Sequence, residues 1–84
     1  MFINKNIDGT NNLCGQNVAV TRKQLNISQK KLADKLQLEG LEIDKNAIQR
    51  IEAGKRFITD IELVYLAKVL NKTYEDLLTQ KNEL

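Results

Sequence analysis

Apolar residues along this 84-residue chain recur mostly at intervals of three and four, the spacing that puts side chains on one face of an α-helix. Five stretches show this pattern, with short breaks between them. They predict helices over residues 15–25, 29–38, 44–53 and 60–70, and a fifth helix from 74 onward. Proline is absent and glycine occurs only 4 times, which removes the usual interruptions of helices. The pattern therefore predicts an all-α fold.

The stretch from 44 to 54 has two unlike faces. Its apolar residues fall on one side: Ala47, Ile48 and Ile51. Its polar residues fan over the other side: Lys45, Asn46, Gln49 and Arg50. Asp44 suits the N-cap, and Gly54 suits the left-handed residue past the end. One face is expected to pack on the body while the other contacts something outside it.

The breaks between helices carry their own signals. An asparagine suited to a left-handed conformation, one spacer and a hydroxyl N-cap occur at 26–28 and again at 71–73. The pairs Thr59–Glu62 and Thr73–Asp76 have the spacing of capping boxes. Gly40 permits the chain to reverse before the third helix. Local sequence signals thus predict the boundaries of helices two to five.

Helical periodicity also predicts which residues face the core. Besides the apolar face of the third helix, the expected inward residues are Val18, Ala19, Leu25, Leu32, Ala33, Leu36, Leu63, Leu66, Ala67, Leu70, Leu77 and Leu78, with Leu41 and Ile43 as anchors between helices two and three. We divide the chain into an Asn-rich, loosely ordered N-terminal arm (1–14), a helical domain (15–79) and a C-terminal tail (80–84). Cys14 is interpreted as a small, partly buried side chain.

Composition narrows the class of protein. The chain is 42% hydrophobic and 29% charged, as in soluble globular domains. No apolar run is long enough for a membrane span or a secretory signal, and a single cysteine cannot form an internal disulfide, so we expect a cytoplasmic protein. The net charge of +2 is distributed unevenly along the chain. Residues 1–35 hold six Lys or Arg and two Asp or Glu, whereas residues 57–84 hold three Lys and five Asp or Glu. A basic first half favours a polyanionic partner.

An enzyme is not expected. There is no histidine, the one cysteine has no activating neighbour, and neither a glycine-rich phosphate loop nor a metal-ligand cluster occurs. We therefore predict no catalytic residue, no cofactor and no metal site.

Four motifs in order carry a family resemblance. They are Arg22; Ser28-Gln29-x-x-Leu32-Ala33; Ile48-x-x-x-Glu52-x-Gly54; and Asp60-x-Glu62-Leu63-x-x-Leu66-Ala67-x-x-Leu70. Together they resemble the lambda-repressor-like, or Xre-type, helix-turn-helix DNA-binding family over roughly residues 15–79. The resemblance implies a compact five-helix domain that binds double-stranded DNA, with helix three in the major groove.

The resemblance also assigns roles to residues. Base contacts are implied for Lys45, Asn46, Gln49 and Arg50. Phosphate contacts are implied for Ser28, Gln29, Lys30, Lys55 and Arg56. Arg22 and Glu52 match an ion pair that orients the reading helix; the alternative is two independent surface charges. The family further implies a homodimer on two similar half-sites.

One interval departs from the family pattern. The distance from Leu32 to Ile48 is about five residues longer than usual, which places residues 37–43 in an extended turn. Either a longer second helix or a wider loop absorbs the extra residues, and each changes how helix three is presented.

Two functions follow. The first is a sequence-specific transcriptional regulator. The alternative is a protein-interaction module, antitoxin-like or adaptor, whose DNA binding is secondary; the acidic last third and the apolar Phe57, Ile58 and Tyr65 favour a protein partner.

Overall fold

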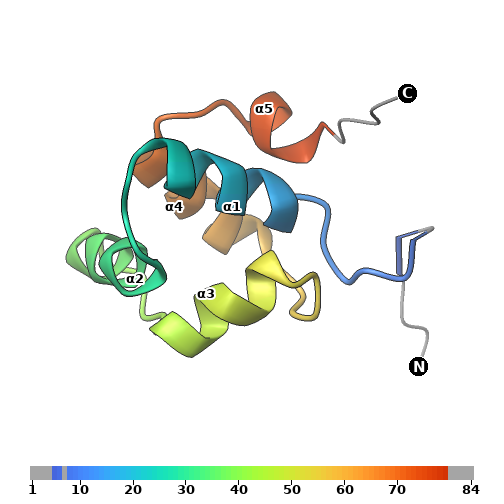
Figure 1. The fold of residues 1–84 in the computed structure, drawn as a ribbon, viewed down its shortest axis with the longest axis horizontal. Coiled ribbons are helices and arrows are strands. Elements are labelled where there is room, and N and C mark those ends of the chain that lie inside the picture. The colour runs from blue at the N-terminus through green and yellow to red at the C-terminus, as the bar shows by residue number, and fades with distance from the viewer. Residues whose placement is uncertain (1–4, 7, 80–84) are drawn as a thin grey trace.

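The computed structural model describes residues 5–6 and 8–79, and these form five α-helices joined by short turns (Figure 1). The helices are α1 (Gly15–Gln24), α2 (Gln29–Leu38), α3 (Lys45–Glu52), α4 (Asp60–Leu70) and α5 (Tyr74–Leu78). No strand occurs among the described residues. The predicted all-α, five-helix fold is confirmed, whereas the predicted tail at 80–84 and the first residues of the arm lie outside the described part.

The predicted helix caps are present. The side chains of Ser28, Asp44, Thr59 and Thr73 each accept a hydrogen bond from a backbone N–H in the first turn of α2, α3, α4 and α5. Both capping boxes form as expected. Asn26 (φ 59°) and Asn71 (φ 56°) adopt the left-handed conformation, and in each case the next helix begins three residues after the asparagine.

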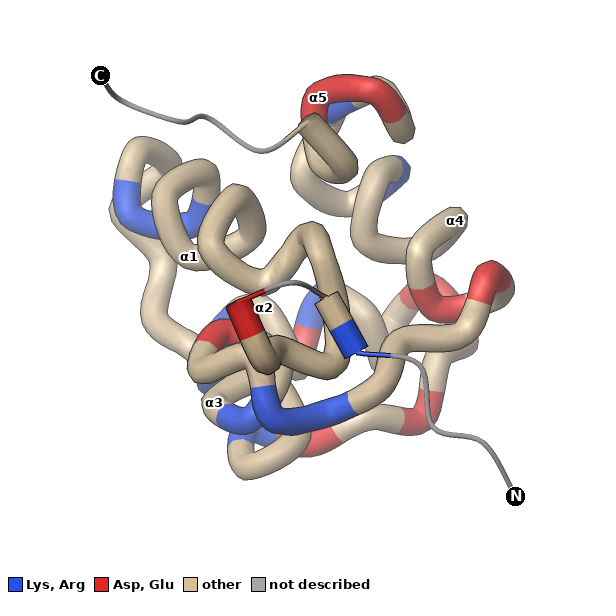
Figure 2. Tube along the Cα trace, turned by 90° about the vertical axis from the view of Figure 1, so that its right-hand side faces the viewer, with Lys and Arg blue, Asp and Glu red and all other residues tan. Residues whose placement is uncertain are grey.

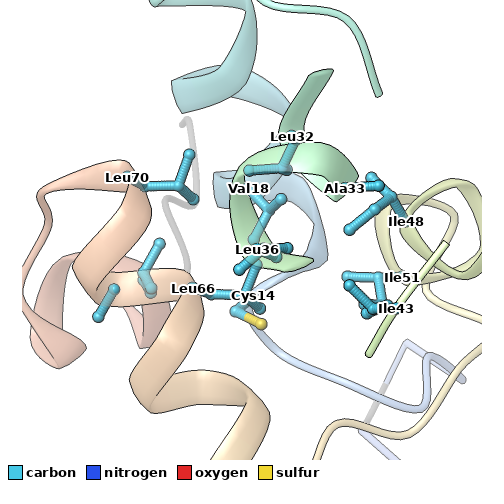
Figure 3. Packing of buried hydrophobic residues seen from close by; sticks show 12 residues of the cluster. Cys14, Val18, Leu32, Ala33, Leu36, Ile43, Ile48, Ile51, Leu66 and Leu70 are labelled. Carbon is cyan, nitrogen blue, oxygen red and sulfur yellow. The ribbon is translucent and has the colours of Figure 1, made fainter. Parts of the chain in front are cut away.

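One core is shared by all five helices (Figure 3). In Figure 3 the buried side chains of α1 and α2 lie between those of α3 and those of α4. The buried apolar residues are Cys14, Val18, Leu32, Ala33, Leu36, Ile43, Ile48, Ile51, Leu66, Ala67, Leu70 and Leu77. Most were predicted from helical spacing, because the same periodicity decides which side of a helix can pack.

The predicted inward face of α1 is partly wrong. Leu25 is 49% exposed; it is the C-cap residue of α1, one position past the last helical residue, Gln24. The buried line is instead Cys14, Val18 and Thr21. Leu78, at the end of the five-residue helix α5, is also more exposed than predicted, at 39%.

The helices enclose this core in a fixed arrangement. α2 and α3 pack together, and α1 contacts α3, α4 and α5. Figure 1 shows α1 between α3 on one side and α5 on the other. The outer face of α3 is therefore left open at the side of the molecule opposite α5. None of the helices in the described residues has the length and apolar character needed to cross a membrane.

The long connection before α3 is a structured turn. α2 continues through Leu38, as its helical spacing predicted, so the extended turn covers residues 39–44 and does not include Gln37 and Leu38. Gln37 Nε2 donates to the carbonyl oxygen of Ile43 (2.6 Å), and the Leu41 N–H donates to the carbonyl oxygen of Leu36 (3.0 Å). Ile43 is buried against the core. The extra residues thus hold the start of α3 in place instead of loosening it.

Candidate nucleic-acid interface

The outer face of α3 is a polar surface on a firmly packed helix. Ile48 and Ile51 are fully buried, and Ala47 packs partly against the core. Lys45, Asn46, Gln49 and Arg50 are all exposed on the other side. We call these four residues the reading face. They combine amide and cationic side chains that do not pack against the core. Such a face can form hydrogen bonds to an external partner.

The N-terminus of α2 lies next to α3, as the packing of these two helices requires. Ser28 Oγ accepts from the Lys31 N–H (3.0 Å), so its own hydroxyl proton can be donated outward. Gln29 Nε2 donates to Glu52 Oε1 (2.9 Å), which ties its amide to the end of α3. Lys30 is exposed and pairs with Asp34 across one turn. The partial positive charge at this helix end favours an anion.

The two basic residues that follow α3 differ in their surroundings. Lys55 is exposed. Arg56 instead makes two 2.9 Å hydrogen bonds to the two carboxylate oxygens of Glu62. This pairing raises the pKa of Arg56 and lowers the pKa of Glu62. A phosphate contact from Arg56 would therefore compete with Glu62.

In Figure 2 the basic stretch after α3 and the acidic first turn of α5 lie at opposite ends of the view.

Arg22 and Glu52 form a partly buried ion pair between α1 and the end of α3. Their side chains are 11% and 9% exposed, and the Arg22 Nε to Glu52 Oε2 distance is 2.7 Å. Hydrogen bonding to Glu52 raises the pKa of Arg22. Arg22 Nη1 also donates to the carbonyl oxygen of Ile27, in the turn between α1 and α2 (2.8 Å). One guanidinium thereby joins three parts of the helix-turn-helix unit.

The contacts of Asn11 and Asn12 with the end of α3 were not predicted, because both residues were placed in a loosely ordered arm. Asn11 and Asn12 donate side-chain hydrogen bonds to backbone carbonyls at the end of α3 and just after it. Asn12 Oδ1 also accepts from the Gly15 N–H (2.8 Å). Asn12 lies two residues before the N-cap of α1, Cys14, which makes no side-chain cap bond, so the usual N-cap pattern did not point to Asn12. The contacts of Asn11 and Asn12 with α3 had no local signal either.

Other chemistry is sparse. Among residues 5–6 and 8–79, no group of three or more His, Cys, Asp or Glu side chains is placed to hold a metal ion. Cys14 is 1% exposed, and its burial raises the pKa of the thiol to about 11.

The fold and the exposed polar helix define a helix-turn-helix protein. A family model described as helix-turn-helix matches residues 20–77, which is more than half of the chain. The chain belongs to this family, in its Xre-type, lambda-repressor-like form, and is thus a DNA-binding transcriptional regulator.

A solved structure has the same fold. It is the restriction-modification controller protein C.AhdI from Aeromonas hydrophila, with a TM-score of 0.65 and 24% sequence identity over 75% of this chain and 84% of that chain. No curated protein matches the sequence.

Proposed function

We propose that this regulator recognises a specific DNA sequence by inserting α3 into the major groove. The observation that carries the proposal is the reading face: four exposed polar side chains on a helix that is anchored on its opposite side by the fully buried Ile48 and Ile51. A helix fits the major groove, where each base pair presents a distinct pattern of donors and acceptors. A rigidly packed helix can hold side chains against that pattern.

The chemistry of the reading face suits base recognition. Asn46 and Gln49 each carry an amide that can bond bidentately to adenine. Lys45 and Arg50 can donate to the acceptor edge of guanine. We therefore assign Lys45, Asn46, Gln49 and Arg50 to base contacts.

Phosphate contacts are proposed on either side of α3. The N-terminus of α2 offers the Ser28 hydroxyl, the second amide proton of Gln29 and the Lys30 ammonium, beside unpaired backbone N–H groups of the first turn. Lys55 supplies an exposed cation after α3. Arg56 is kept in the set, although a phosphate must draw it from Glu62.

A homodimer is proposed because the chain exposes apolar side chains around the start of α4. Phe57, Ile61 and Val64 are 51%, 63% and 49% exposed. Ile61 and Val64 are three residues apart and share one helix face. In the proposed dimer this surface is buried between two copies, and the α3 helix of each copy binds one half-site. The half-sites would then lie one helical turn apart, about 34–36 Å.

Selection of bound sequences from a random DNA pool tests the proposal. We expect enrichment of a two-fold symmetric motif, and binding to it that weakens steeply with salt because phosphate contacts release counterions. Failure to enrich any motif would overturn sequence-specific recognition. If no motif were enriched and a different protein co-purified stoichiometrically after nuclease treatment, the protein-interaction function would replace sequence-specific recognition.

A further inference from the structure

The Asn12 side chain bridges elements that are far apart in sequence. Its Nδ2 donates to the carbonyl oxygens of Ile51 (3.1 Å) and Arg56 (2.8 Å), and its Oδ1 accepts from the Gly15 N–H (2.8 Å). One amide thus links the start of α1, the last turn of α3 and the loop after α3. Both the nitrogen and the oxygen of this amide are therefore hydrogen-bonded within the protein.

The contact between α1 and α3 at this point is very close. A Cβ atom built on Gly15 would lie 2.1 Å from the carbonyl oxygen of Ile51 and 2.8 Å from Asn12 Oδ1. Only a residue without a side chain allows the α1 backbone to approach the end of α3 so closely. Asn12 occupies the space beside this approach and bonds to both sides of it.

Asn11 extends the same attachment along the loop. Its backbone N–H donates to the carbonyl oxygen of Gly54 (2.8 Å), and its Nδ2 donates to that of Lys55 (3.0 Å). Residues 11 and 12 therefore bond to four carbonyl groups between 51 and 56. This stretch ends the reading helix and carries the proposed phosphate contacts at Lys55 and Arg56.

We propose that Asn12 is a positioning residue of the DNA-reading unit, and that Asn11 and Asn12 belong to that unit. The proposal rests on the proposed function. Asn12 need not touch DNA, since its amide is used within the protein. It sets the position of the α3 C-terminus and of Lys55 relative to α1, so that the reading face and the phosphate contacts meet one duplex together.

The test compares Asn12→Ala with Asn17→Ala. Asn17 is a matched control, because its Nδ2 also donates to two backbone carbonyls, those of Leu77 (2.8 Å) and Thr79 (2.9 Å), but it ties α1 to the end of α5. Affinity for the selected DNA site and for random DNA is measured where both variants are fully folded. We expect Asn12→Ala to weaken specific binding about tenfold and random binding less than about threefold, and Asn17→Ala to change neither more than about twofold.

If Asn12→Ala does not fold, Asn12→Asp and Asn17→Asp take their places. Aspartate at 12 still accepts from Gly15 but loses both donors to α3, and the two variants carry the same added charge. Equal specific affinities within either pair would overturn the role of Asn12. Absence of specific binding by the unaltered protein would instead overturn the proposed function, so the two failures are distinguishable.

Discussion

The guanidinium of Arg22 binds both carboxylate oxygens of Glu52, with Nε–Oε2 at 2.7 Å and Nη2–Oε1 at 3.1 Å. Gln29 adds a third donor to the same carboxylate. Glu52 therefore accepts hydrogen bonds from α1 and α2 at the last residue of α3. This arrangement fixes the direction of the reading helix at the end where the chain leaves it.

Removing Glu52 should cost more stability than its charge alone suggests. Glu52→Ala leaves the partly buried Arg22 and Gln29 donors without their acceptor, so we expect the free energy of unfolding to fall by about 2–3 kcal/mol. Urea denaturation measures it. Glu42→Ala, which removes an exposed carboxylate from the 39–44 turn, is the control and should change stability by less than about 0.5 kcal/mol. Similar losses in both variants would show that the Arg22–Glu52 pair does not hold α3.

Gly15→Ala should destabilise the protein although alanine is the better helix former. The new Cβ would lie 2.1 Å from the carbonyl oxygen of Ile51, so the backbones of α1 and α3 must separate. We expect a loss of about 2–4 kcal/mol, against a gain of about 1 kcal/mol from helix propensity alone. Gln16→Ala, at the next and exposed position, should be within about 0.5 kcal/mol of the unaltered protein. A more stable Gly15→Ala variant would contradict the close approach.

Glu62 makes stability depend on pH in acid. Its pKa lies below the ordinary value of 4.5, chiefly because Arg56 donates to it. A depressed carboxyl pKa stabilises the fold above the pKa of the unfolded chain, and that contribution is lost as pH falls through the folded value.

Glu62→Gln keeps an oxygen for the Thr59 cap but loses the ion pair, so we expect it to be about 1 kcal/mol less stable than the unaltered protein near neutral pH. In urea titrations at several pH values, the difference should begin to shrink as the pH falls below about 4.5 and vanish once the pH has passed the lower pKa of the folded state. The pKa of Asp8 is also lowered, but Asp8 contributes equally to the pH dependence of stability in both proteins, so it cancels in the difference. A difference that persists unchanged in acid would rule out this linkage.

Cys14 should be unreactive in the folded protein. Its thiol is 1% exposed with a pKa of about 11, so only about one molecule in a thousand is a thiolate near pH 8. Labelling by an aromatic disulfide should proceed only at the rate at which the fold opens, and should become fast in urea. Rapid labelling of the native protein would contradict the burial of Cys14.

Local signals in the sequence predicted most of the fold. Caps such as Ser28 and Thr59, and the left-handed Asn26 and Asn71, act within a few residues of the helices they bound, so their positions can be read directly. Helical periodicity found the core of α2, α3 and α4 for the same reason. Leu25 was misplaced because helical spacing alone does not show whether a neighbouring element covers the end of a helix.

Tertiary relationships were less accessible. The reading face could be predicted as a set of polar residues, since amphipathicity is a local property. The contacts of Asn12 with Ile51 and Arg56 could not, because they join residues about forty positions apart and leave no periodic trace. The pairing of Arg56 with Glu62 spans only six residues, but it crosses the turn between α3 and α4, where helical spacing does not apply, and it was not predicted.

The most direct measurement compares the affinity of Arg50→Ala and Lys72→Ala for the selected DNA site and for random DNA. Both variants lose one exposed cation, but Lys72 lies in the turn between α4 and α5, away from α3. If α3 reads bases, Arg50→Ala should lose about tenfold or more in affinity for the selected site and less than about threefold for random DNA, while Lys72→Ala resembles the unaltered protein on both. Equal losses by Arg50→Ala on both DNAs would contradict base reading by α3.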